Sequence, residues 1–174
     1  MSCQRGSADA STRGVTVRVA AVSDLAEIAR LEAELFADAW SSASLMPYVT
    51  GGTGNTGHAA WVLEVVPSGQ KAIIPRQRVA GYLLYSWVLD EGSIDRIGVT
   101  GEHQRRGIGR VLLEYALSAL GGRGIRQVWL EVGASNEAAI RLYEAVGFSI
   151  VSRRTGYYVG PPPDDALVMN KVIE

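Results

Sequence analysis

Between residues 93 and 132 the sequence leaves few choices of fold. A β-prone run at 93–99 ends in a polar turn, and Gly107 and Gly109 then open an amphipathic helix that extends to residue 120. A second β-prone run follows at 127–132. Because strands joined by a helical crossover lie parallel in one sheet, this stretch predicts an α/β protein.

Weaker patterns on both sides of this unit predict the remaining elements. The expected strands span 15–20, 59–66, 78–88, 93–99, 127–132, 148–152 and 166–172, and the expected helices span 25–36, 41–49, 107–120 and 135–146. Ser23 and Ser135 are the expected N-caps of the first and last helices. Consecutive strands without an intervening helix form antiparallel hairpins. We therefore expect an α/β fold with a mixed, mostly antiparallel central sheet and helices on both faces.

Length and composition predict the domain organisation. A chain of 174 residues, 47% of them hydrophobic, predicts one domain over 15–174 after a flexible tail at 1–14. No run approaches the ~20 apolar residues of a membrane span. A net charge of −1 does not favour nucleic acid or a membrane surface as a partner. One cysteine and two distant histidines predict no internal disulfide and no zinc site, so we expect a cytoplasmic protein without a metal.

The glycine-containing turn has the chemistry of an anion site. The first N–H groups of a helix lack intrahelical partners and lie at the positive end of its dipole, which suits a phosphate. Gly107 and Gly109 allow close approach of the backbone, while three nearby arginines add positive charge. A dinucleotide fingerprint would need a glycine where Leu112 stands, and no Walker-type Gly-Lys-Ser/Thr is present. The spacing alone also fits a purely structural turn.

A second group of polar residues surrounds the next helix. Glu131 lies at the carboxyl end of a strand, where open α/β sheets place their ligands. Asn136 and Tyr143 are seven residues apart and share one helix face. These three side chains can converge on one cleft. Each residue taken alone also has a purely structural interpretation. Glu131 fits a solvated acid at a strand end, Asn136 fits a helix cap, and Tyr143 fits a packed core residue.

Two segments carry a resemblance to a known family. Gln104-Arg105-Arg106-Gly107-Ile108-Gly109 matches the Gln/Arg-x-x-Gly-x-Gly/Ala signature of the Gcn5-related N-acetyltransferases, the GNAT family. The block from Trp129 to Phe148 resembles the ribosomal-protein alanine N-acetyltransferases, the RimI type, within that family. The resemblance implies the cosubstrate acetyl-CoA, with the pyrophosphate held by backbone amides. The residues that it places on acetyl-CoA are Ile97, Gly98, Val99, Arg105, Arg106, Gly107, Ile108, Gly109, Arg110 and Asn136.

The same resemblance implies the chemistry and the acceptor. Glu131 is the expected general base, acting through water, and Tyr143 the expected general acid toward the coenzyme A sulfur. The expected acceptor is the α-amine at a protein N-terminus, namely the N-terminal alanine of a small-subunit ribosomal protein. An α-amine, with a pKa near ~8, is neutral more often at neutral pH than a lysine amine near ~10.4, which is consistent with this acceptor. Acetylation of a lysine or a small-molecule amine, and a non-catalytic acetyl-CoA-binding module, remain as alternatives.

Three departures from the family pattern concern the acceptor side. Gly133 stands where the family usually has Arg, so one positive group near the base is missing. Thr155-Gly156 places Tyr157-Tyr158 one residue further from Arg154 than expected. The segments 51–57 and 67–77 are longer than usual. These departures affect peptide recognition more than acetyl transfer.

Overall fold

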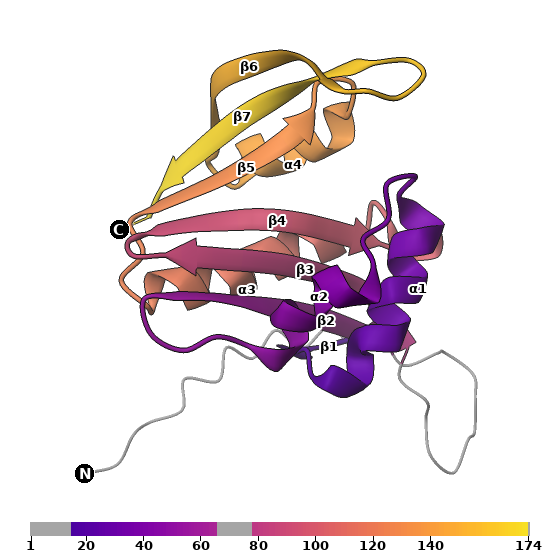
Figure 1. The fold of residues 1–174 in the computed structure, drawn as a ribbon, viewed down its shortest axis with the longest axis vertical. Helices are drawn as coiled ribbons and strands as arrows, with labels where there is room; N and C mark the ends of the chain where they lie inside the picture. Colours follow the sequence, from indigo (N-terminus) through magenta and orange to yellow (C-terminus); the bar gives the residue numbers. More distant parts are fainter. Residues whose placement is uncertain (1–14, 66–77, 174) are drawn as a thin grey trace.

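The computed structural model describes residues 15–65 and 78–173 and contains seven strands, four α-helices and two short 3-10 turns (Figure 1). The expected tail at 1–14 and the expected surface segment at 67–77 lie outside the described residues. In chain order the elements are β1 (Val15–Val19), η1 (Val22–Asp24), α1 (Leu25–Leu35), α2 (Ser42–Thr50), β2 (Thr56–Val65), β3 (Arg78–Val88), β4 (Glu91–Val99), η2 (Gly101–His103), α3 (Ile108–Gly121), β5 (Gln127–Gly133), α4 (Glu137–Ala145), β6 (Ser149–Tyr158) and β7 (Asp164–Val172).

All seven strands form one sheet in the order β1-β2-β3-β4-β5-β7-β6. The pair β4–β5, which α3 connects, is parallel, and the other pairs are antiparallel. The expected mixed, mostly antiparallel sheet is therefore confirmed. The chain inserts β7 between β5 and β6, so β6 lies at the edge of the sheet.

The two central strands separate along their length. Parallel pairing between β4 and β5 covers only four residue pairs, from Glu91 with Gln127 to Ile94 with Leu130. Both strands continue beyond the last pair, β4 to Val99 and β5 to Gly133, without pairing to each other. Figure 1 shows the two ribbons moving apart in this direction. The backbone on the facing edges of these strand ends is therefore left without a partner strand, and buried groups of this kind need other partners.

Helices cover both faces of the sheet, as expected. One core lies under α1 and α2 and includes Ile28, Leu31, Leu45 and Tyr82. The other core lies between the opposite face and the helices α3 and α4, with Leu112, Leu113 and Tyr143 among its members. In Figure 1, α1 and α2 lie in front of the sheet and α3 lies behind it. Within residues 15–65 and 78–173, no helix is long and apolar enough to cross a membrane.

The expected caps of the first and last helices are wrong. The chain forms a 3-10 turn over Val22–Asp24 before α1, and Asp24 accepts a hydrogen bond from the backbone N–H of Ala21 at 2.7 Å, so Ser23 lies inside that turn. Helix α4 is capped by Asn136, whose side-chain oxygen accepts from the N–H of Ala139 at 3.1 Å. The hydroxyl of Ser135 instead donates a hydrogen bond to the carboxylate of Asp164 at 2.7 Å.

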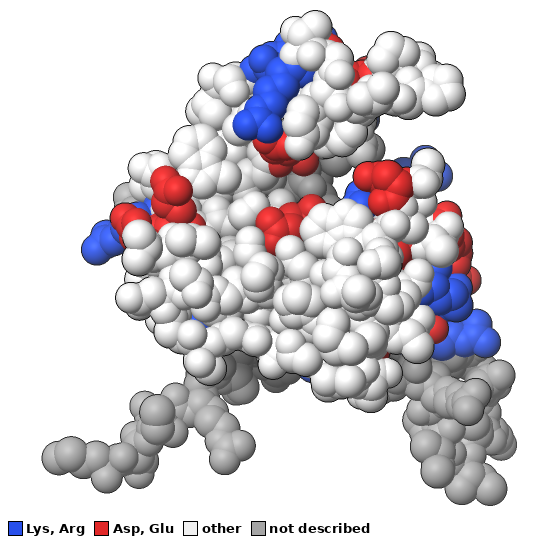
Figure 2. Space-filling model, in the orientation of Figure 1, with Lys and Arg blue, Asp and Glu red and all other residues white. Residues whose placement is uncertain are grey.

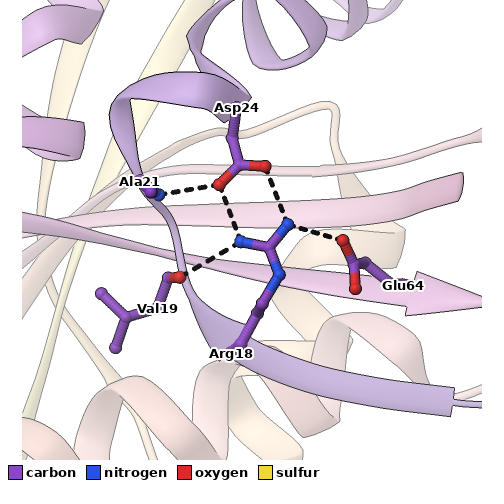
Figure 3. Close-up of polar contacts among 5 residues, drawn as sticks. All are labelled: Arg18, Val19, Ala21, Asp24 and Glu64. Carbon is purple, nitrogen blue, oxygen red and sulfur yellow. Dashed lines mark hydrogen bonds and ion pairs between the residues drawn. The ribbon is translucent and has the colours of Figure 1, made fainter. Parts of the chain in front are cut away.

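A network around Arg18 joins the first elements of the chain (Figure 3). Two guanidinium nitrogens of Arg18 donate to the two carboxylate oxygens of Asp24 at 2.7 and 2.8 Å, and one also donates to Glu64 at 2.5 Å. Arg18 belongs to β1, Asp24 to η1 and Glu64 to β2. The bidentate geometry fixes the start of α1 against the edge of the sheet.

Candidate active site

A hollow of about 350 Å³ lies where β4 ends and α3 begins, and we name it the α3 hollow. Its walls come from the end of β4, from the turn before α3, from the first turn of α3 and from α4. They consist of Ile97, Val99, His103, Gln104, Arg105, Gly107, Ile108, Gly109, Arg110, Asn136, Ala138, Ala139 and Leu142. Eight of the residues expected on acetyl-CoA line this one cavity.

The backbone at the start of α3 is shaped to meet an anion. Gly107 is the N-cap in a left-handed conformation, with φ of 80°, and no side chain caps the helix. A β-carbon at Gly107 would meet nothing within 4 Å. Arg105 also has a positive φ of 58°, which is uncommon for a residue with a side chain. The N–H groups of the first turn therefore face the hollow without a competing side-chain acceptor.

Two of the expected cofactor residues do not line the hollow. Gly98 alternates with Ile97 and Val99 along β4 and so faces the other side of the sheet, where a β-carbon would lie 2.5 Å from the ring of Tyr82. The exposed Arg106 lies in the turn before α3, outside the lining. A contact of Gly98 or Arg106 with the cofactor remains a prediction, and for Gly98 it would be through the backbone.

A second hollow of about 350 Å³, which we name the central hollow, continues from the first. The two share Ile97, Asn136 and Ala139. Both expected catalytic residues line it, Glu131 from β5 and Tyr143 from α4. The sequence pattern that placed these residues in one cleft is therefore matched by the geometry, while their catalytic roles remain predictions.

Glu131 stands in a partly open position with a cationic neighbour. About a third of its side chain is exposed. The guanidinium of Arg154, on β6, lies 2.6 Å from its carboxylate and also stacks over the ring of Tyr157 at 5.4 Å. Arg154 thus supplies a positive group beside the expected base, where the sequence comparison suggested that one was missing.

Tyr143 differs from Glu131 in being buried and in having no ion-pair partner among the residues that the structure describes. Its side chain is almost completely buried and its ring packs edge-on against Phe148, with centroids 5.9 Å apart. Burial, with a smaller effect of Tyr158, raises the pKa of the Tyr143 phenol well above its usual value of 10. The hydroxyl therefore stays protonated throughout the neutral range, as a proton donor must.

The structure explains why glycine, and not the arginine usual in the family, stands at position 133. A β-carbon there would lie 2.7 Å from a carboxylate oxygen of Asp164 at the start of β7. That oxygen accepts hydrogen bonds from the backbone N–H of Ser135 at 3.0 Å and from its hydroxyl at 2.7 Å. The two bonds from Ser135 hold the pKa of Asp164 below its usual value. Asp164 thus ties β7 to the loop that leads into α4, and a larger residue at Gly133 would displace it.

A third hollow of about 550 Å³, the outer hollow, adjoins the base on the side away from α3. It is lined by Asp38, Trp40, Tyr48, Ser93, Ile94, Asp95, Arg96, Glu131, Tyr157 and Tyr158. The Tyr48 hydroxyl donates to Asp95 at 2.9 Å and the Trp40 and Tyr48 rings lie 5.8 Å apart. Figure 2 shows the cleft between the β5–β7–β6 part of the molecule and the part below it, with acidic side chains on both walls.

Most residues of the outer hollow were not assigned to a site from the sequence. Asp95 and Arg96 are adjacent in the sequence, whereas Asp38 lies more than fifty residues before them, and only the fold brings the three residues to Glu131. The available signals were aromatic residues that the RimI-type resemblance also includes, namely Trp40 near the start of the chain and Tyr157-Tyr158 near its end. Among the residues that the structure describes, no group of three His, Cys, Asp or Glu side chains could hold a metal ion.

Comparison with known proteins assigns the family. The model of the acetyltransferase (GNAT) family matches residues 27–148. This chain belongs to the GNAT family. It is 34% identical over 155 residues, 88% of this chain and 95% of the relative, to the [ribosomal protein bS18]-alanine N-acetyltransferase of Salmonella typhimurium. The expected family, fold and dependence on acetyl-CoA are thereby confirmed, and the chain is an acetyl-CoA-dependent N-acetyltransferase.

Solved structures agree with this assignment. The ribosomal-protein-S18-alanine N-acetyltransferase of Escherichia coli superimposes with a TM-score of 0.76 at 30% identity, covering 92% of this chain and 94% of that one. Arabidopsis thaliana NAA60 in complex with acetyl-CoA superimposes with the same TM-score at 21% identity, covering 91% and 98%. The second likeness concerns the fold alone.

Proposed function

We propose that this chain transfers the acetyl group of acetyl-CoA to the α-amine of a protein N-terminus, namely the N-terminal alanine of a small-subunit ribosomal protein. The observation that carries the proposal is the continuity of the three hollows, with Glu131 and Tyr143 between the uncapped helix and the acceptor side. The relatives named for this reaction match most of the chain. Such a substrate places the activity in the cytoplasm, where ribosomal proteins are made.

The α3 hollow has the size and the donors to hold the diphosphate end of acetyl-CoA. The N–H groups at the start of α3 would bind the phosphate oxygens, and Arg105 and Arg110 on the wall add positive charge. Ile97 and Val99 extend the wall toward the central hollow along β4. Acetyl-CoA supplies a thioester, and the β4 backbone beyond the last pair with β5 can donate a hydrogen bond to its carbonyl oxygen.

Glu131 and Tyr143 divide the proton transfers. The partly exposed Glu131 accepts a proton from the acceptor ammonium through water, which makes the amine nucleophilic. The phenol of Tyr143 is protonated and faces the central hollow, so it can donate a proton to the departing thiolate. An α-amine with a pKa near ~8 is about one-tenth neutral at pH 7, so a base that takes its proton is worth about tenfold there, within the reach of one carboxylate.

A panel of acceptors tests the proposal. A peptide that begins with alanine, the same peptide with a blocked N-terminus and an internal lysine, and a polyamine are incubated with acetyl-CoA and analysed by mass spectrometry. We expect acetylation at the α-amine of the first peptide, at a rate at least tenfold above the others. Faster modification of the lysine or of the polyamine would favour those acceptors instead, and binding of acetyl-CoA without any product would favour a non-catalytic module.

Two variants test the assigned roles. Tyr143→Phe keeps the ring and its packing but removes the proton donor, so turnover should fall at least tenfold. Glu131→Gln should lower turnover similarly and should lose less at high pH, where the free α-amine dominates. Both variants should bind acetyl-CoA as the wild type does, measured by calorimetry. Unchanged turnover in either variant removes the corresponding role.

A further inference from the structure

An arginine without a role in the proposed proton transfers lies almost buried beside the two proposed catalytic residues. The side chain of Arg96, on β4, is only 13% exposed, yet it lines both the central and the outer hollow. Arginine is rarely buried without partners, because removing its charge from water is costly. Its partners therefore indicate what it does.

The partners of Arg96 come mainly from the segment between α1 and α2, residues 36–41. Its guanidinium donates to the backbone carbonyl of Asp38 at 3.1 Å and to the carboxylate of the same residue at 3.3 and 3.4 Å. It also lies over the rings of Phe36, at 4.3 Å, and Trp40, at 5.1 Å. One side chain of the sheet thus contacts the beginning, the middle and the end of this segment.

The other side of Arg96 faces a fully buried acid. Glu32, in the last turns of α1, lies 3.5 Å from the Nε of Arg96, which makes an ion pair without hydrogen-bond geometry. The same carboxylate accepts hydrogen bonds from the hydroxyl of Tyr82 and, at 3.0 Å, from the backbone N–H of Trp40. Arg96 therefore contacts the segment along its length, and Glu32 binds the backbone at its Trp40 end.

The segment matters because it forms a wall of the acceptor side. Phe36 and Asp38 line the central hollow, and Asp38 and Trp40 line the outer hollow, on the side opposite Tyr157 and Tyr158. The segment has no strand or helix hydrogen bonding of its own between Phe36 and Ser41. Its conformation thus depends on side-chain contacts, and Arg96 makes contacts with Phe36, Asp38 and Trp40.

We propose that Arg96 is a positioning residue that fixes residues 36–41 as the acceptor-side wall and thereby sets the affinity for the acceptor. This inference rests on the function proposed above. Arg96 lines no part of the α3 hollow, so we expect the diphosphate end of acetyl-CoA, which supplies most of its contacts there, to bind without Arg96. A lysine would keep one positive charge but would lose the planar fork that reaches Asp38 and the stacking on both rings.

Steady-state kinetics with the alanine peptide test the proposal. Arg96→Met should raise the acceptor KM at least tenfold, and Arg96→Lys should raise it less, while the KM for acetyl-CoA stays within twofold. Arg30→Lys is the matched control, because Arg30 lies on the surface of α1 and, among residues 15–65 and 78–173, pairs with Glu27 and Glu34 of the same helix alone. An unchanged acceptor KM in Arg96→Met, or an equal rise in both KM values, overturns the proposal.

Two further measurements keep the test decisive. If Arg96→Met does not fold, Asp38→Asn replaces it, because the Asp38 side chain is 70% exposed; a rise of about threefold in acceptor KM supports the proposal and no rise overturns it. Hydrogen exchange of residues 36–41, faster in the Arg96 variants than in the wild type, reports positioning without catalysis.

If the wild type acetylates none of the acceptors, the proposed function fails. The exchange data then decide whether Arg96 orders the segment: faster exchange supports that role and unchanged exchange overturns it.

Discussion

Gly98→Ala is the substitution for which the structure makes the sharpest prediction. A β-carbon at this position would lie 2.5, 2.7 and 2.9 Å from Cε1, Cζ and Oη of Tyr82. Tyr82 cannot move aside at low cost, because it is fully buried and its hydroxyl donates to the fully buried Glu32. One added methyl group must therefore displace the ring or break that hydrogen bond.

The cost has two parts. Overpacking of a well-filled core costs about 1–3 kcal/mol. Loss of a buried hydrogen bond to a charged acceptor costs about 1.5–3 kcal/mol. We expect Gly98→Ala to lower the free energy of unfolding by about 3–5 kcal/mol. For a chain of this size each kcal/mol corresponds to about 2–4 °C, so Tm should fall by roughly 6–20 °C.

Urea unfolding followed by circular dichroism measures this effect. Gly101→Ala is the matched control, since a β-carbon there meets nothing within 4 Å and should leave stability nearly unchanged. In a Tyr82→Leu background, the additional effect of Gly98→Ala should largely disappear, because the two substitutions share one contact. A Gly98→Ala variant within 1 kcal/mol of the wild type would refute the steric argument.

Three other predictions concern the α3 hollow, the carboxylate of Asp24 and the buried tyrosines. Gly109→Trp should abolish acetyl-CoA binding in calorimetry, because the indole would fill the α3 hollow beside Leu142; normal binding would contradict the assignment of the hollow. Asp24→Asn should cost about 1–3 kcal/mol at pH 7 by weakening the bonds from Arg18. Those bonds lower the pKa of Asp24 in the folded chain, so the ionised carboxylate stabilises the fold fully above pH ~4. The stability difference between Asp24→Asn and the wild type should shrink to zero in urea titrations performed at progressively lower pH, as Asp24 becomes protonated in the fold. Stability should also decline as pH rises above ~10. Burial raises the pKa of five tyrosines in the folded chain, so above that pH only the unfolded chain ionises them, and urea titrations at pH 9 and pH 11 measure the loss. These tyrosines are Tyr48, Tyr82, Tyr85, Tyr143 and Tyr158.

The sequence alone predicted those features that depend on a periodic pattern of apolar residues or on a short continuous motif. Apolar periodicity, together with caps and turn residues, predicted the seven strands and the four α-helices of the described chain, and the crossover between residues 99 and 127 predicted the parallel pair. The glycine turn predicted the position of the α3 hollow, because its anion chemistry is local to one helix start. Glu131 was expected at this cleft because it ends a strand, and Tyr143 because it shares a helix face with Asn136; the structure places both on the central hollow.

Features that depend on a distant partner could not be predicted. Glu32 and Arg96 are charged residues within apolar patterns, and only the packing of α1 on β4 shows that they are buried together. Ser23 and Ser135 are good caps in isolation, but Asp24 and Asp164 change the local bonding. Strand β6 extends to Tyr158, well beyond the expected residue 152, because its exposed edge position leaves no alternation to detect.

The separation of β4 from β5 also divides the proposed cofactor site and the proposed catalytic residues between two stretches of chain. Residues 15–121 contain the helix start and the residues around Arg96, whereas residues 127–173 contain Glu131, Tyr143 and Arg154. Only four residue pairs and the apolar packing beneath them join the two central strands of these stretches. Cleaving the chain between α3 and β5 would therefore produce two fragments that are each inactive, and acetylation should return only when both are mixed and dock.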